Sequence, residues 1–223
     1  KLLADWVGVD TAQLPALAAD LVDECGKLAL AIAMVGATLR GRAPDRWTDM
    51  LMRLRTADLE KLRRDFPAYP YPTLLRAIGA SVDVLEPKDR DRYLDLAVFP
   101  DGAVIPESVL QTLWASLGFD GADVRDLVDR WTDRSLARRT DGGIRLHDLQ
   151  RDYVVKRRAP LETLHRQLID AYRARIVDGW AGLAEPYLFE RRAWHLAQAQ
   201  PGEELGALLR DPRRLQAKLL ASM

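Results

Sequence analysis

Residues 144–153 read Ile-Arg-Leu-His-Asp-Leu-Gln-Arg-Asp-Tyr. Apolar and polar residues alternate over 144–146, which predicts a short strand, and the residues after His147 predict the start of a helix. Histidine can donate a hydrogen bond to a phosphate near neutral pH. Asp148 suits the first helical turn, because it can cap exposed N–H groups and it complements the helix dipole. The stretch therefore predicts a His-Asp pair placed to sense a ligand, and the alternative is a histidine that only tethers a loop.

The residues ahead of this stretch predict its partner strand. Residues 135–139 can pair with 144–146 across the turn Asp141-Gly142-Gly143. Further upstream, apolar residues at helical spacing predict helices over 74–85, 89–99, 106–114 and 124–131. Several helices that are closed by one hairpin are typical of a winged helix, in which the hairpin is the wing.

The prolines of Phe66-Pro67-Ala68-Tyr69-Pro70-Tyr71-Pro72 indicate a domain boundary, because proline prevents both helix continuation and strand pairing. We expect little regular structure over 66–71 and separate cores on its two sides. The fold class is mainly α. We expect a helical bundle over 1–68, a winged helix with one small β-hairpin over 69–155, and the N-terminal part of a second helical domain over 156–223.

Composition limits the function. Formal net charge is 0, and the 48% hydrophobic content is enough for a real core. The single cysteine, Cys25, excludes an internal disulfide and fits a reducing, cytoplasmic compartment; we expect it to be buried, without a catalytic role. No apolar run is long enough for a membrane span. The remote spacing of the three histidines predicts no metal site, with His165 at the surface and His195 packed.

Three motifs then occur in a consistent order. The run Cys25-Gly26-Lys27-Leu28-Ala29-Leu30-Ala31-Ile32 resembles a Gly-Leu-Pro-Leu-Ala motif that opens a helix, with Ala29 in the position of the proline. Trp47 and a leucine stripe follow. Leu146-His147-Asp148 resembles a Met-His-Asp motif. Over nearly the whole chain this set resembles the NB-ARC family of signal-transduction ATPases, which includes apoptotic protease-activating factors and plant disease-resistance proteins.

The resemblance implies roles for particular residues. His147 would contact the bound diphosphate, and Leu28 and Ala29 would lie on the nucleotide side of their helix. Gly26 and Asp148 would support the geometry of the two motifs. ADP or ATP is then the expected cofactor of the longer parent protein, and none is expected for this chain alone.

The chain lacks a phosphate-binding loop and paired acids for magnesium. It begins at Lys1 within a helical pattern, so we expect a fragment that follows the nucleotide-binding domain of a parent ATPase and is not itself an enzyme. The expected partners are that upstream domain, further copies of the protein on activation, and possible downstream repeats such as WD40. The upstream signal, the effector and the oligomeric state stay open.

Two other functions are compatible with these patterns. One is a DNA-binding transcription regulator that uses the wing, with Arg138, Arg139 and Arg145 as its basic cluster. We do not expect nucleic acid binding, because the recognition-helix candidate over 123–134 carries four acidic and three basic residues, without the basic surplus that phosphate contacts need. The other is an interaction scaffold that senses no nucleotide.

Charge is also uneven along the chain. Residues 71–155 carry an excess of acidic side chains, and residues 156–223 carry an excess of basic ones. We therefore expect an interface between these two segments that contains some ion pairs, although screened surface pairs are weak and apolar contact must supply most of the stability.

Overall fold

The computed structural model describes residues 1–57, 62, 64–66, 72–176, 185–199 and 202–210. In chain order its elements are α1 (Leu2–Val7), the 3-10 helix η1 (Thr11–Gln13), α2 (Ala18–Glu24), α3 (Ala29–Leu39), α4 (Pro44–Thr56), α6 (Pro72–Val82), α7 (Pro87–Asp95), η2 (Leu96–Val98), α8 (Glu107–Trp114), η3 (Ala115–Leu117), α9 (Gly121–Asp133), β1 (Arg138–Thr140), β2 (Gly143–Arg145), α10 (Asp148–Arg158), α11 (Glu162–Arg173), α12 (Pro186–Gln198) and α13 (Glu203–Leu209).

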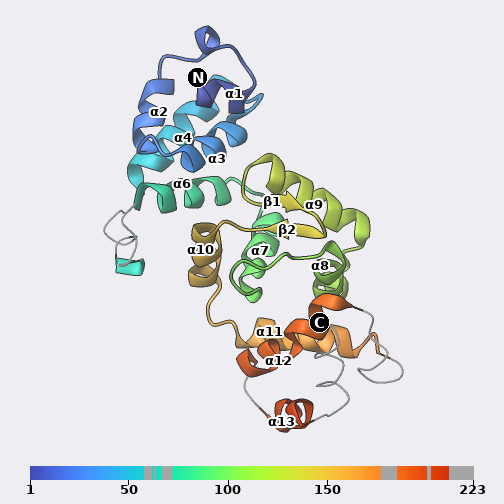
Figure 1. Ribbon diagram of the computed structural model, residues 1–223. Coiled ribbons are helices and arrows are strands. Elements are labelled where there is room, and N and C mark those ends of the chain that lie inside the picture. Colours follow the sequence, from blue (N-terminus) through green and yellow to red (C-terminus); the bar gives the residue numbers. More distant parts are fainter. Residues whose placement is uncertain (58–61, 63, 67–71, 177–184, 200–201, 211–223) are drawn as a thin grey trace. The chain divides into compact units, whose positions relative to one another are not determined.

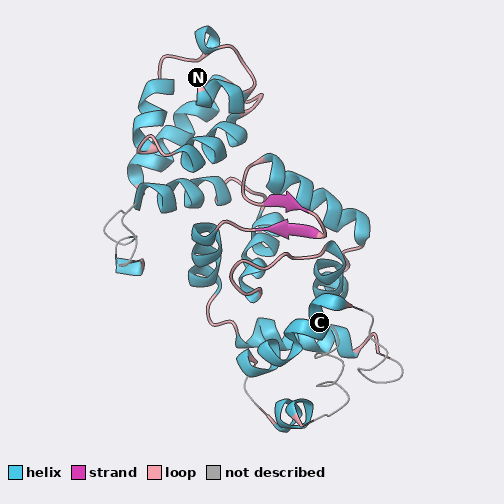
Figure 2. Ribbon diagram, viewed as in Figure 1, coloured by secondary structure: helices cyan, strands magenta, loops and turns pink. Residues whose placement is uncertain are grey.

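Most of the described chain is helical, and β1 and β2 form one small antiparallel hairpin (Figure 2). The prediction of a mainly α fold with a small hairpin is therefore confirmed. None of the helices in the described ranges is both long and apolar enough to cross a membrane.

The chain divides into two compact units, and each is described by itself. Unit 1 contains Lys1–Val104 and Arg125–Arg157, and unit 2 contains Ile105–Val124 and Arg158–Met223. The domain boundaries expected at 68/69 and 155/156 remain a prediction.

Helix α3 lies among α1, α4 and α6 in the N-terminal part of unit 1 (Figure 1). Every residue from Ala31 to Leu39 is buried, as expected for a helix that is apolar on all faces. Helices α1 and α6 both pack against it. The contact with α1 depends on Gly36, because a Cβ atom there would lie only 2.8 Å from the Cβ of Trp6. A small residue in α3 thus allows the two helices to approach closely.

A charge network joins α2, α4 and α6 on one side of α3. Arg76 on α6 is 6% exposed and lies 2.9 Å from a carboxylate oxygen of Glu24. Arg55 on α4 binds the same carboxylate at 3.2 Å and Asp20 at 2.8 Å. The buried guanidinium of Arg76 is therefore paired, which limits the free-energy cost of removing it from water.

The expectation of separate cores on the two sides of the proline-rich run is wrong. Helix α6 follows that run, and yet it packs against α3 and α4, which precede it. Its buried face carries Leu74, Leu75 and Ile78, which complete the core around α3. Residues 67–71 themselves lie outside the described residues, so the expected lack of regular structure there is not tested.

The second half of unit 1 is built around Trp131 of α9 and Tyr93 of α7. Both side chains are fully buried, and their rings meet edge to face with centroids 5.6 Å apart. The Tyr93 hydroxyl donates to the carbonyl oxygen of Leu136, 2.9 Å away, where the chain leaves α9 for the hairpin. The hairpin pairs Arg138 with Arg145 and Thr140 with Gly143.

In unit 2, α11 packs against both α8 and α12. The contact between α8 and α11 joins the 71–155 and 156–223 segments, so the expected contact between them is confirmed, whereas the ion pairs expected across it remain a prediction. Its polar contacts include Ser108, which donates to Glu185 over 2.9 Å, and Arg175, which donates to the hydroxyl of Thr112.

The two histidines of unit 2 are buried together. His195 is packed, as predicted, but the surface position expected for His165 is wrong, since its exposed fraction is 1%. Their Nδ1 atoms are 2.9 Å apart, and Nε2 of His195 is 2.9 Å from the Tyr187 hydroxyl. Each ring thus finds polar partners in the core, which allows burial of the neutral form.

Burial lowers the pKa of His165 to about 4, and burial together with the nearby charges of His165 and Arg191 also lowers the pKa of His195. An unfolded histidine has a pKa near 6.5. The unfolded chain therefore binds more protons below about pH 6.5, and the stability that neutral histidines contribute is lost as pH falls from there towards about 4.

Between pH 7 and pH 4 the shift of His165 alone should lower the stability of unit 2 by about 3 kcal/mol, and the shift of His195 should add to this loss. Hydrogen exchange of α11 and α12 amides across this pH range measures the loss. His165→Gln should flatten the pH slope, because it removes one titrating group, whereas Gln111→Ala at an exposed site should leave it unchanged. An equal slope in wild type and His165→Gln would contradict the assignment.

Candidate functional site

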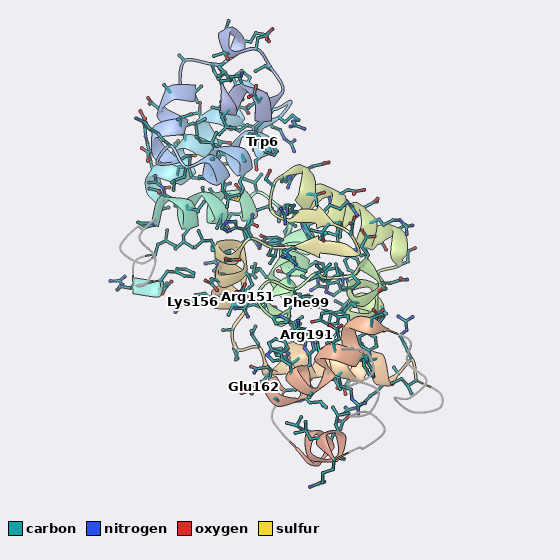
Figure 3. All side chains as sticks on the ribbon, in the orientation of Figure 1. Trp6, Phe99, Arg151, Lys156, Glu162 and Arg191 are labelled. Carbon is teal, nitrogen blue, oxygen red and sulfur yellow. The ribbon has the colours of Figure 1, made fainter. Side chains whose placement is uncertain are left out.

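The His147 region lines a cavity of about 620 Å³ within unit 1. A volume of this size is in the range of small-molecule sites. Helices α1 and α3 form one wall, and the end of α9, the hairpin and the start of α10 form the other. The lining residues are Trp6 (labelled in Figure 3), Leu30, Ala33, Thr132, Ser135, Ala137, Arg138, Arg139, Arg145, Leu146, His147, Asp148 and Gln150.

His147 caps the N-terminus of α10. Its Nδ1 atom accepts a hydrogen bond from the backbone N–H of Leu149, 3.3 Å away. A neutral imidazole that accepts at Nδ1 carries its proton on Nε2. His147 is exposed, so the cap leaves an Nε2–H donor available to a ligand in the cavity. The local geometry thus selects the tautomer that can donate to a phosphate oxygen.

Gln150 holds this turn from the other side. Its Oε1 atom accepts a hydrogen bond from the backbone N–H of His147 at 3.0 Å, while Nδ1 of His147 accepts one from Leu149, so the two side chains cap the first turn of α10 together. Its Nε2 atom donates to the carbonyl oxygen of Ser135 at 2.7 Å and contacts the Met34 sulfur at 3.4 Å. The side chain is 2% exposed. Gln150 therefore ties the His147 turn to the hairpin and to α3.

Three arginines bring positive charge to the cavity. Arg138 and Arg139 are exposed on β1, and Arg139 is paired with Asp129 of α9. Arg145 on β2 is partly buried, and its Nε atom is buried without a hydrogen-bond partner in the described structure. A buried donor with no partner is uncommon in proteins. The lining of the cavity therefore combines positive charge with one arginine, Arg145, whose buried Nε donor is unused.

The Gly26 motif forms a tight turn ahead of α3. Gly26 and Lys27 both have positive φ, at 62° and 58°. A Cβ atom at Gly26 would lie 2.9 Å from Oγ1 of Thr73, so a side chain there is disfavoured both by φ and by space. Leu28 and Ala29 then begin α3, whose first turn has no side-chain cap.

The structure brings the two motifs to the same part of unit 1. Leu30, one residue after Ala29, lines the cavity together with His147, whereas Leu28, Ala29 and Gly26 are not among its lining residues. Asp148 lines the cavity and is exposed as the first residue of α10. It is the acidic residue of the first turn of α10, as expected, and the side chain of His147 accepts the hydrogen bond from the Leu149 N–H.

Gln150 is the main residue that sequence reasoning missed. A polar cap residue followed three positions later by glutamine is a known start signal for helices, and His147 and Gln150 have this spacing. The contacts of Gln150 with Met34 and Ser135 have no such signal, because they join residues 116 and 15 positions apart.

Cys25 is buried beneath this part of the chain, as predicted. Burial raises the pKa of its thiol to about 12, so the reactive thiolate is disfavoured. Across the residues that the structure describes, no group of three His, Cys, Asp or Glu side chains could hold a metal ion.

Gln150→Leu should destabilise unit 1 by about 1–3 kcal/mol, because it leaves the part-buried Ser135 carbonyl and the part-buried His147 N–H without their partner. It should also release the His147 ring, so that both neutral tautomers become populated. Urea unfolding measures the first effect, and nitrogen chemical shifts of the imidazole measure the second. The control is Gln111→Leu, at an exposed position on α8. A single Nε2–H tautomer that persists in Gln150→Leu would contradict the positioning role.

Comparison with known proteins finds related chains. Apoptotic protease-activating factor 1 of Danio rerio is 30% identical over 94% of the chain, and the human protein of that name is 27% identical over 98%. A probable disease resistance protein of Arabidopsis thaliana is 33% identical over 45% of the chain. No protein-family model matches the sequence.

The chain spans only 17% and 18% of the two apoptotic protease-activating factors, and its match covers 12% of the plant protein. The residue motifs resembled those of apoptotic protease-activating factors and plant disease-resistance proteins, and the homologues belong to these two groups. The resemblance to the NB-ARC family is therefore confirmed.

Proposed function

We propose that the chain is the regulatory arm of a nucleotide-controlled switch. It is homologous to apoptotic protease-activating factor 1 and to plant disease resistance proteins, as expected for a segment of an NB-ARC signalling protein. In the longer protein, ADP would hold this arm against the upstream nucleotide-binding domain. Exchange for ATP would release the arm and expose a surface for oligomerisation. The full-length protein would act in the cytoplasm, and repeats could follow this segment.

The observation that carries this proposal is the held turn of His147. Its Nδ1 atom is engaged by the Leu149 N–H, and its backbone N–H is engaged by Gln150. The ring is therefore oriented before a ligand arrives, which reduces the entropy cost of binding. A phosphate is the group that fits, since an Nε2–H donor and positively charged guanidiniums line one cavity.

The residues of α3 support the same ligand. The first turn of α3 has no side-chain cap, and the N–H groups of a helix start attract negative charge. Leu30 and Ala33 add apolar surface to the cavity, which suits the base or sugar of a nucleotide. ADP would supply the diphosphate that His147 reads, and Leu28 and Ala29 would lie on its base side.

The charges of α9 favour this function over a DNA-binding wing. Arg130 is engaged by both carboxylate oxygens of Asp89, at 2.7 and 3.2 Å, and Arg139 on the wing is engaged by Asp129. These pairings neutralise basic side chains that phosphate contacts with DNA would need. The exposure of His147 supports the switch over a scaffold that senses no nucleotide.

His147→Asn in the intact protein should speed ADP release by about 10- to 100-fold, since a charge-assisted hydrogen bond contributes about 1.5–3 kcal/mol. Asparagine is a good N-cap residue, so it keeps α10 capped while it removes the Nε2–H donor. The off-rate of a fluorescent ADP analogue is the measurement. Arg125→Gln, at an exposed position on α9, is the control and should release ADP at the wild-type rate. Equal off-rates for His147→Asn and wild type would leave His147 as a loop tether.

The 223-residue chain alone should not hydrolyse ATP, because phosphoryl transfer needs a phosphate cradle and magnesium ligands that its sequence lacks. Phosphate release with excess ATP and magnesium should equal that of the buffer. Turnover that persists after repurification and co-elutes with the chain would refute this.

A further inference from the structure

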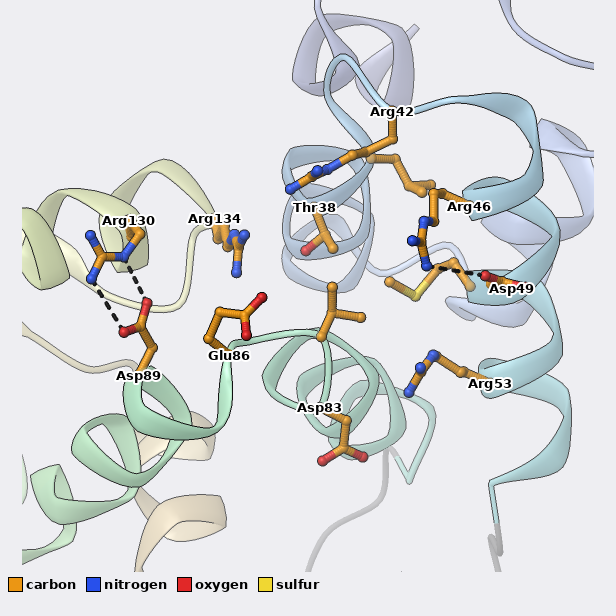
Figure 4. Close-up of a pocket in the computed structure, with 13 residues that line it drawn as sticks. Thr38, Arg42, Arg46, Asp49, Arg53, Asp83, Glu86, Asp89, Arg130 and Arg134 are labelled. Carbon is orange, nitrogen blue, oxygen red and sulfur yellow. Dashed lines mark hydrogen bonds and ion pairs between the residues drawn. The ribbon is translucent and has the colours of Figure 1, made fainter.

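A second cavity, of about 320 Å³, lies in unit 1 and shares no lining residue with the His147 cavity. Its walls come from the end of α3, helix α4 with the turn before it, the turn between α6 and α7 with the start of α7, and the end of α9 (Figure 4). The lining residues are Thr38, Leu39, Arg42, Arg46, Asp49, Met50, Arg53, Asp83, Val84, Glu86, Asp89, Arg130 and Arg134.

Two of the five arginines in this cavity already have carboxylate partners. Arg130 binds Asp89 through two nitrogens, and Arg46 lies 3.5 Å from Asp49. No ion pair within 4.0 Å engages Arg42, Arg53 or Arg134 in the described parts of the chain. The cavity therefore retains guanidiniums whose charge is not matched by direct contact.

Arg42 and Arg134 approach the cavity from different elements. Figure 4 shows Arg42 extending from the turn after α3 towards Arg134, which follows the end of α9. Arg134 is partly buried. Burial and the charges of Arg42 and Arg130 lower the pKa of Arg134, against the charges of Asp89 and Glu86, which raise it. An anion between the two side chains would offset the repulsion between their charges.

We propose that this cavity binds a small phosphate-bearing anion through Arg42 and Arg134. Two planar guanidiniums from opposite walls can donate to different oxygens of a tetrahedral group, which a single carboxylate would serve less well. The volume admits a compact ligand such as pyrophosphate. Arg53 adds positive charge from α4.

Glu86 and Asp83 also face this cavity, and they oppose an anion. Glu86 lies close enough to Arg134 to affect its electrostatics. Its carboxylate therefore weakens anion binding, and its removal should strengthen it. This opposite response of an acidic neighbour gives the proposal a second, independent test.

A bound anion would join two parts of unit 1. Arg42 belongs to the first helical segment, and Arg134 follows α9 near the hairpin. A ligand held by both would resist separation of those parts and would stabilise unit 1 by mass action. A small anion bound here would therefore hold these two parts of unit 1 together independently of the His147 cavity.

Isothermal titration of the 223-residue chain with pyrophosphate, at constant ionic strength, tests the site. We expect saturable binding that weakens at least tenfold in Arg42→Gln and in Arg134→Gln and tightens in Glu86→Gln. Arg125→Gln is the matched control on α9 and should bind as wild type does. Because Arg42 is exposed, its variant should fold even if Arg134→Gln does not, and circular dichroism checks both.

The His147 cavity is also lined by arginines, so Arg145→Gln separates the two sites. Binding that persists in Arg145→Gln and fails in Arg42→Gln supports the proposal. Binding that fails in Arg145→Gln and persists in Arg42→Gln belongs to the other cavity and overturns it. Absence of saturable pyrophosphate binding in the wild-type chain overturns it as well.

Discussion

The buried amide of Gln150 is the interaction on which the arrangement of unit 1 most depends. It is 2% exposed, and its two ends serve three different segments: the His147 turn, the carbonyl of Ser135 and the sulfur of Met34. Burial of an amide costs free energy unless its N–H donors and its oxygen form hydrogen bonds. The three segments that supply the partners of Gln150 are therefore fixed relative to one another. The position of His147 is a consequence of that requirement.

Helix α3 connects the two cavities of unit 1. Leu30 and Ala33, near its start, line the cavity that contains His147, and Thr38 and Leu39, at its end, line the cavity that contains Arg134. The helix dipole is positive at the start and negative at the end. A ligand phosphate therefore suits the cavity at the start of the helix directly. The cavity at its end is lined by arginines, and these side chains can bind an anion.

The sequence predicted the elements that follow from local patterns. The hairpin, the strand-to-helix turn at His147 and the helix that begins at Ala29 all occur where alternation, turn residues and apolar spacing indicated them. Separate cores were predicted from the prolines at 67, 70 and 72, and this was wrong because proline acts on the backbone near it. It does not determine which apolar face the following helix covers, and α6 covers α3.

His165 shows the same limit in a side chain. Its sequence neighbours indicated a surface residue, but its partner is His195, which is 30 positions away on another helix. The sequence alone therefore determined the mainly α class, the order of the elements, the motifs around Ala29 and His147, and the lack of a phosphate-binding loop. The tertiary structure decided which polar groups are buried, that Gln150 holds the His147 turn, and which arginines share a cavity. Those properties depend on contacts between distant residues, and local periodicity carries no information about them.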